Sequence, residues 1–165
     1  GTSAISEQRK MFEQLKSGSD LSLEEFKEAF EGKEMNINSP MEAGQTFLHV
    51  ALDQNLLVIV EYLIARGANL RATDDEGSTP LHMCRSLAAL KLLLEADPKL
   101  DINAVDENST TAFAQLLTIR DMDEATFLVL TEEYKVDIHK RNIRLESPLH
   151  FAARFGSERV VELLL

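Results

Sequence analysis

The sequence predicts an all-α solenoid of stacked helix–turn–helix units, and three observations carry that prediction. One tetrapeptide recurs from Thr46, Thr79, Thr111 and Ser147, at spacings of 33, 32 and 36 residues. A polar segment containing Asp or Asn precedes each of the three later copies. An apolar run follows every copy, at residues 59–64, 90–94, 125–130 and 160–165. Self-similarity at a period near 33 residues indicates repeated helix pairs that bury their apolar stripes against one another.

The recurring tetrapeptide is suited to begin a helix. Thr46, Thr79 and Ser147 carry hydroxyl oxygens that can accept backbone N–H groups at an N-cap. Pro80 and Pro148 follow two of them, and proline has a φ already set for the first helical position. Each copy is therefore expected to open the first helix of a unit, and the apolar run after it to form the second.

These motifs resemble the ankyrin repeat. The resemblance rests on the tetrapeptide Thr-Pro-Leu-His, the alanine pair 152–153, the apolar run 160–165 and the turn 67–70, and it covers residues 35–165. It implies a solenoid whose turns project as β-hairpin fingers. The implied repeats lie at about 35–68, 69–100, 101–136 and 137–165.

Residues 1–34 lack the tetrapeptide and are expected to form a cap-like helix pair. Ser22 and Glu25 have the spacing of a capping box, and Phe26 and Phe30 lie on one apolar stripe. Residues 1–3 are expected to be a cloning remnant. The last repeat ends on an apolar run, so we expect it to be truncated and the natural array to continue.

Two repeats depart from the pattern. The second has three residues fewer between its helix start and its second apolar run, which is interpreted either as drift in a surface loop or as a notch that receives a partner side chain. The third is degenerate, because Ala112 and Ala114 replace the proline and the histidine. In ankyrin repeats that histidine bonds neighbouring backbone, and losing one such bond costs about 1 kcal/mol. The third repeat is therefore expected to be the least stable.

An unusually apolar stretch, residues 56–60, opens the second helix of the first repeat, where the family usually has polar residues at two positions. Two interpretations remain open. The stretch packs against the bulky cap with Phe26 and Phe30, or it forms an exposed apolar patch usable as an interface.

Composition excludes several classes of function. The 165 residues carry a net charge of −11, from 17 basic and 28 acidic side chains. This balance argues against nucleic acid or an anionic membrane as the main partner and permits a basic protein partner. No apolar run is long enough to be inserted into a membrane. The single cysteine, Cys84, excludes an internal disulfide framework. We therefore expect a cytoplasmic protein, with the nucleus as the alternative.

The sequence predicts no enzyme, no catalytic residues, no cofactor and no metal site. His49, His82 and His150 occupy the structural position of the repeat, and no Cys or carboxylate is spaced with them as metal ligands usually are. His139 is expected on the surface. Cys84 lies at a small-residue position and is expected to be buried and inert.

A protein partner is the remaining prediction, and the oligomeric state is left open. The resemblance implies that fingertips and the groove-facing side of the first helices make the contacts. Arg and aromatic residues are frequent among binding hot spots. Carried over position by position, the predicted partner-binding residues are Glu42, Asp75, Glu76, Glu107, Asn108, Thr118, Ile119, Arg141, Ile143, Arg144, Arg154 and Phe155.

Two interpretations of this surface stay open. Acidic fingertips would steer a basic partner segment toward the first half of the array. Ile143 and Phe155 would either contact a partner or pack against a further repeat. The predicted function is a scaffold, adaptor or targeting module; the alternative is a regulatory or targeting domain of a larger enzyme, channel or bacterial effector.

Overall fold

The computed structural model describes the backbone of residues 2–18, 21–31, 35–155 and 158–165, with side chains for all of these except 2–4 and 155. Every regular element of this part is helical. In chain order the helices are α1 (Thr2–Lys16), α2 (Leu23–Phe30), η1 (Glu42–Gly44), α3 (Phe47–Asp53), α4 (Leu57–Ala65), η2 (Pro80–Met83), α5 (Leu87–Ala96), α6 (Ala112–Leu116), α7 (Glu124–Glu133), α8 (Pro148–Phe155) and α9 (Glu158–Leu164).

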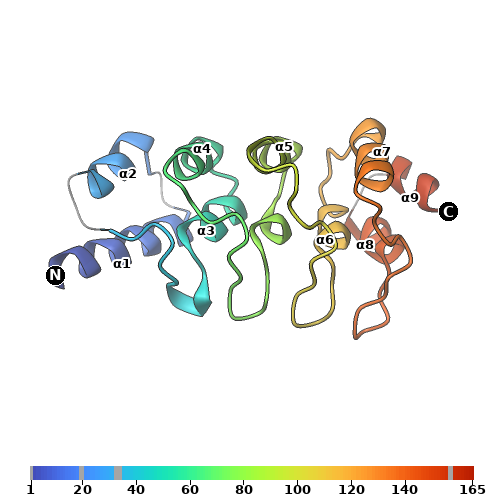
Figure 1. The fold of residues 1–165 in the computed structure, drawn as a ribbon, viewed down its shortest axis with the longest axis horizontal. Coiled ribbons are helices and arrows are strands. Elements are labelled where there is room, and N and C mark those ends of the chain that lie inside the picture. The colour runs from blue at the N-terminus through green and yellow to red at the C-terminus, as the bar shows by residue number, and fades with distance from the viewer. Residues whose placement is uncertain (1, 19–20, 32–34, 156–157) are drawn as a thin grey trace.

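The helices form two rows, as the repeat pattern predicts. The second helices α2, α4, α5, α7 and α9 lie side by side in one row, and the first helices lie in a row beneath them (Figure 1). The loops between successive units project from the same side of the array as four fingers (Figure 1). Ladder pairing in the described residues is limited to one isolated bridge, between Val105 and Thr111. The fingers are therefore tight turns, whereas β-hairpins were expected.

Phe47 anchors the N-terminal helix pair to the first repeat. It occupies the tetrapeptide position that Pro80 and Pro148 hold in other copies. Its ring centroid lies 6.2 Å from that of Phe12, 5.8 Å from Phe26 and 5.1 Å from Phe30. Edge-to-face contacts of this kind stabilise an aromatic cluster beyond the area they bury. The departure from proline at this position therefore joins the cap to the array.

A histidine joins each of the first two repeats to the next one. The backbone N–H of Thr46 donates to Nδ1 of His49 over 3.1 Å, and Nε2 of His49 lies 2.9 Å from the carbonyl oxygen of Ser78. His82 repeats the arrangement, with Nε2 3.1 Å from the carbonyl oxygen of Thr110. Because Nδ1 accepts, the proton of the neutral ring is on Nε2, which donates to the following finger. Both rings are buried.

The short second repeat has lost helix, and not only loop. Its first helix, η2, is a single 3-10 turn, and the chain is already extended at Cys84. Arg85 then donates to the Asp53 carboxylate of α3 over 2.9 Å, and the hydroxyl of Ser86 donates to Asn55 over 2.8 Å. The shortened segment, interpreted from sequence as loop drift or as a notch, is thus held to the first repeat by two side-chain hydrogen bonds.

The third repeat lacks a histidine contact, as its sequence predicts. Ala114 lies at the histidine position, and α6 has only five residues. The linker from α6 to α7 folds back on the core, where Leu117, Ile119 and Met122 are all buried. This linker therefore supplies apolar packing to a repeat whose first helix is short.

The apolar stretch 56–60 is partly packed into the core and partly exposed, so each of the two interpretations applies to some of its residues. Ile59 and Val60 are buried in the core, and Leu56 and Leu57 pack against it. Val58 is 56% exposed and lines a shallow apolar depression with Leu56 and Leu57.

In the described part of the chain, no helix has both the length and the apolar character needed to cross a bilayer.

Stability should fall as the pH drops below about 6.5, because the buried histidines must stay neutral. Burial lowers the pKa of His49 and His82, so between the lowered folded-state pKa and the unfolded-state value of about 6.5 the unfolded chain binds more protons than the folded chain. Urea unfolding between pH 7.5 and 5.5 should show a loss of at most about 1.4 kcal/mol per pH unit for each histidine.

A double variant, His49→Asn with His82→Asn, should be less stable at pH 7.5 and show a flatter pH profile. His139→Asn changes an exposed histidine and is the matched control. An equally steep profile in the double variant would contradict the assignment.

Candidate protein-interaction surface

The four fingers share one five-residue turn. We define finger one as residues 41–45, finger two as 74–78, finger three as 106–110 and finger four as 142–146. In each, the N–H of the first residue donates to the carbonyl oxygen of the fifth, over 2.8, 3.1, 3.0 and 3.0 Å in chain order. Fingers two to four therefore share one backbone geometry, whereas finger one differs at its third residue, because Ala43 is also left-handed, at φ +58°.

An Asx side chain fixes the tip of fingers two to four. In finger two, Oδ1 of Asp74 accepts the N–H groups of Glu76 and Ser78, both over 2.9 Å. Asp106 and Asn142 accept the equivalent pairs in fingers three and four over 2.9 and 3.0 Å. Such bonds hold a turn whose own backbone has few partners.

One backbone hydrogen bond links each finger to the one before it. The N–H of the second residue donates to the carbonyl oxygen of the third residue in the preceding finger. Asp75 N–H donates to Ala43 over 2.9 Å, and Glu107 N–H donates to Glu76 over 2.7 Å. Ile143 N–H completes the series, donating to Asn108 over 2.9 Å. The fingers thus form a continuous row joined by backbone hydrogen bonds.

The fourth residue of every finger is left-handed. Its φ is +71° at Gly44, +78° at Gly77, +59° at Ser109 and +63° at Leu145. Glycine adopts this region without strain, whereas a residue with a Cβ does so at a cost of about 1–2 kcal/mol. Leu145 is therefore a strained residue, and its side chain is 67% exposed.

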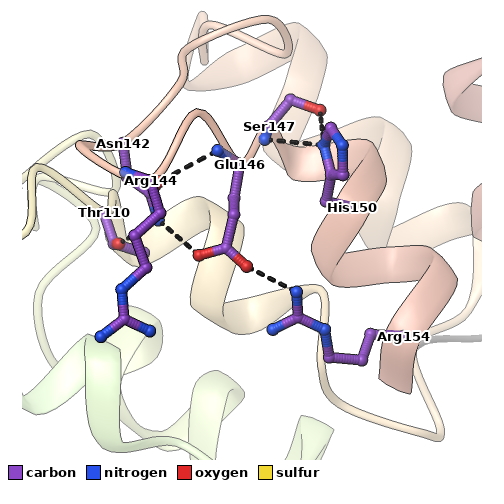
Figure 2. Close-up of polar contacts among 7 residues, drawn as sticks. All are labelled: Thr110, Asn142, Arg144, Glu146, Ser147, His150 and Arg154. Carbon is purple, nitrogen blue, oxygen red and sulfur yellow. Dashed lines mark hydrogen bonds and ion pairs between the residues drawn. The ribbon is translucent and has the colours of Figure 1, made fainter.

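A groove of about 330 Å³ runs beneath fingers two to four, against the first helices. Glu146 lines the groove, and an Arg154 nitrogen of α8 lies 2.5 Å from one of its carboxylate oxygens (Figure 2). Hydrogen bonds from Asn142 and Arg154 hold the pKa of Glu146 below its usual range. Arg144 and Asp106 also line the groove. The lining of the groove is thus polar and includes side chains of both charges.

The Asn142 amide donates two hydrogen bonds that an aspartate could not donate. Its amide nitrogen donates to the Thr110 hydroxyl over 2.9 Å and to the Glu146 carboxylate over 3.1 Å (Figure 2). Fingers two and three have Asp74 and Asp106 at this position. The amide therefore connects fingers three and four at the step where Ala114 removes the histidine contact.

The predicted acidic residues lie along the first three fingers. Asp75, Glu76 and Glu107 are exposed at the tips. Glu42 is exposed in finger one, where Lys16 of α1 lies 2.7 Å away and lowers the pKa of its carboxyl group. Glu42 is thus already paired within the chain, in contrast to the carboxylates of fingers two and three, for which the described residues provide no ion pair.

The predicted basic and apolar residues gather at the other end of the row. Arg141, Ile143 and Arg144 are exposed on and beside finger four, and Arg154 is exposed on α8. Asn108, half-buried in finger three, lines the same groove as Arg144 and Arg154. The structure therefore brings these five predicted residues into one neighbourhood.

The prediction that Ile119 belongs to the contact surface is wrong. Ile119 is only 2% exposed, because the linker after α6 turns it into the core. Thr118 beside it is half-buried, and its hydroxyl donates to the carbonyl oxygen of Gln115 over 2.7 Å. The side chain of Phe155 lies outside the described residues.

Leu145 was not among the predicted residues, although a signal was present. It lies three residues after Asn142, as Gly77 does after Asp74. Aligning the turns would have placed a leucine where the second finger has glycine.

The described residues offer little for covalent or metal chemistry. Cys84 is buried, and burial raises the pKa of its thiol to about 12. No cluster of three or more His, Cys, Asp or Glu side chains suited to a metal ion occurs in the part of the chain that the structure describes.

Comparison with known proteins agrees with the architecture. A sequence profile described as "Ankyrin repeats (3 copies)" matches residues 4–106, and a second, described as "Ankyrin repeats (many copies)", matches residues 120–165. The first match begins within α1, so it includes the N-terminal helix pair that lacks the tetrapeptide.

Curated relatives carry similar stretches. Rabankyrin-5 of Homo sapiens is 28% identical over 157 residues, covering 74% of this chain and 13% of that protein. Transient receptor potential cation channel subfamily A member 1 of Homo sapiens is 32% identical over 125 residues, covering 74% and 11%. RelA-associated inhibitor of Mus musculus is 33% identical over 132 residues, covering 76% and 16%. The chain thus spans less than a fifth of each of these relatives.

Replacing Asn142 by aspartate should loosen the step between fingers three and four. Asn142→Asp removes two donated hydrogen bonds and places a second carboxylate beside Glu146. Urea unfolding should show a loss of about 1–3 kcal/mol. Asp106→Asn is the matched control, because it keeps the Oδ1 acceptor of finger three and should cost less than about 1 kcal/mol. Equal losses in both variants would contradict a special role for the amide.

Replacing Leu145 by glycine should stabilise the fold. Relief of the left-handed strain outweighs the extra freedom of glycine in the unfolded chain, so Leu145→Gly should raise the free energy of unfolding by about 0.5–1 kcal/mol. Ser109→Gly, the same position of finger three, should act in the same direction. Ile143→Gly, an equally exposed neighbour outside the left-handed region, should not stabilise. A loss of stability in Leu145→Gly would show that the leucine has a folding role.

Proposed function

The chain belongs to the ankyrin-repeat family, whose repeats are a protein-interaction module, and we propose that this array binds a protein partner through its fingers and groove as a scaffold, adaptor or targeting module. The observation that carries the proposal is the continuous row of fingers. Asp75, Glu107 and Ile143 hold equivalent tip positions, each with its N–H bonded to the preceding finger and its side chain exposed.

Binding by this surface would work through rigid presentation. The bonds within and between fingers order the tips before a partner arrives, so little conformational entropy is lost on association. Different side chains can then occupy the second and third positions of each finger without altering the backbone. Specificity would come from those positions and from groove residues such as Arg144 and Arg154.

Fingers two and three would attract a basic partner segment. Asp75, Glu76 and Glu107 are exposed, and the described residues give their carboxylates no ion pair. Clustered carboxylates on a chain of net charge −11 raise the association rate of a basic partner, and salt weakens the effect. This part of the row is therefore proposed as the steering surface.

The second candidate is a regulatory or targeting domain of a larger enzyme, channel or bacterial effector. It is supported by the small share of each relative that this chain spans, one of those relatives being a cation channel. We propose that the array itself has no catalytic activity and binds no cofactor or nucleic acid. We place the protein in the cytoplasm, with the nucleus as the alternative, because its one cysteine is buried and free.

Affinity capture from cell lysate with quantitative mass spectrometry tests the proposal. The bait is the 165-residue chain, compared with a triple variant, Asp75→Asn, Glu76→Gln and Glu107→Gln. Partners steered by the acidic fingers should be captured several-fold less by the triple variant, and wild-type capture should fall as salt rises.

A matched control changes charges elsewhere. Lys91→Gln with Glu95→Gln alters two exposed residues of α5, in the row of second helices, and should leave capture unchanged. Capture that is identical for wild type and the triple variant would contradict the steering role. Capture that is equal for all variants, including Arg144→Glu in the groove, would contradict binding by this surface.

A further inference from the structure

Finger four differs from the other fingers in two exposed positions. Its second residue, Ile143, is 66% exposed, where fingers two and three have Asp75 and Glu107. Its fourth residue, Leu145, is 67% exposed, where finger two has Gly77. Two large apolar side chains two residues apart thus project from a tip that is polar or acidic in its neighbours.

Leu145 is unfavourable for the stability of the turn that it occupies. It holds a φ of +63°, and its exposed side chain gains little from packing in return. Residues held in such conformations concentrate at sites where the surrounding structure tolerates strain for function. An apolar group kept exposed in a strained conformation therefore indicates a contact made outside this chain.

A further finger that followed at the spacing of the first two steps would crowd a leucine at this position, although the third step accommodates the smaller side chain of Ser109. A Cβ added at Gly44 would lie 2.4 Å from Oδ1 of Asp75, and one added at Gly77 would lie 3.2 Å from the N of Glu107. The fourth position of a finger therefore faces the finger that follows it closely. A leucine there carries three carbon atoms beyond Cβ, more than these two steps leave room for.

The charge around finger four is opposite to that of the chain. Residues 138–146 contain three basic residues, Lys140, Arg141 and Arg144, against one acidic residue, Glu146, in a protein of net charge −11. All three cations are exposed. Arg154 lies nearby at the Glu146 carboxylate (Figure 2). The apolar pair is thus flanked by cations.

We propose that finger four is an anchor that inserts Ile143 and Leu145 into an apolar pocket bordered by Asp and Glu side chains on the partner protein. This inference rests on the proposed function and deepens it, because it assigns to one end of the row a partner chemistry opposite to that at fingers two and three. The partner surface is therefore bipartite, basic opposite fingers two and three and acidic with an apolar centre opposite finger four.

An anionic membrane would also attract cations beside apolar groups, but the observations favour a protein. The exposed carboxylates of Asp75, Glu76 and Glu107 belong to the same row of fingers and would be repelled by anionic lipid. A protein surface can present acidic groups to finger four and basic groups to the others. The experiment must therefore be able to distinguish binding to a membrane from binding to a protein.

Peptide selection tests the anchor without a known partner. A random twelve-residue library displayed on phage is selected on the 165-residue chain, and affinities of the enriched peptides are measured by fluorescence polarisation. Peptides that combine Asp or Glu with large apolar residues should be enriched. Their affinity should fall at least tenfold for Leu145→Gly and for Arg144→Glu.

Ser109→Gly is the matched control, because it makes the same change at the same position of finger three. Leu145→Gly and Ser109→Gly should both shift urea unfolding to higher concentration, while only Leu145→Gly weakens the peptides. Opposite effects of one substitution on stability and on affinity separate a binding role from a structural one.

Three results would overturn the inference. Enriched peptides that are basic, and that lose affinity only for the triple variant at Asp75, Glu76 and Glu107, would leave the proposed function standing without the anchor. Peptides whose affinity is unchanged by every finger and groove substitution would contradict both the anchor and the proposed function. Binding of the chain to phosphatidylserine-containing vesicles that is lost in Leu145→Gly would replace the protein pocket with a membrane.

Discussion

The arrangement of the fingers depends on the neutral histidine between successive repeats. His49 accepts the N–H of Thr46 at Nδ1, so its Nε2 proton is directed to the carbonyl oxygen of Ser78, the last residue of the next finger. One ring thereby closes the start of a helix and fixes the base of the following turn. Because both rings are buried, each contact requires that the histidine stay uncharged. The helix start and the finger cannot move independently while this bond holds.

The rest of the row follows from that constraint. With the base of each finger fixed, the bond from the second residue to the preceding finger sets the distance between neighbouring tips. At the third repeat the histidine is absent, and the chain substitutes a different link, from the Asn142 amide to Thr110 and Glu146. At this step the backbone bond from Ile143 to Asn108 is therefore supplemented by side-chain bonds between the fingers instead of by a histidine.

The sequence predicted the features that depend on local pattern. The period and the helix starts could be inferred from the recurring tetrapeptide, and the roles of His49 and His82 from the resemblance to ankyrin repeats. Features that depend on how the chain packs could not. Ile119 follows a helix of only five residues, and nothing local indicates that its linker turns inward. The second repeat showed a deletion, but only the structure shows that it shortened η2, since loop and helix are equally able to lose residues.

In fingers two and three, the residues that maintain the turn differ from those proposed to contact a partner. In finger four, Leu145 belongs to both groups. In fingers two and three the first and fourth residues maintain the turn, while the second and third are free to vary at little cost. Gly77 shows the structural use of the fourth position, since a Cβ there would crowd Glu107. In finger four this position is occupied by Leu145, whose apolar side chain is exposed and whose backbone is strained in the left-handed region. A substitution predicted to stabilise the fold at Leu145 would remove the side chain proposed to contact the partner, so the two proposed roles oppose each other at Leu145, whereas at Asp75 no such conflict is expected.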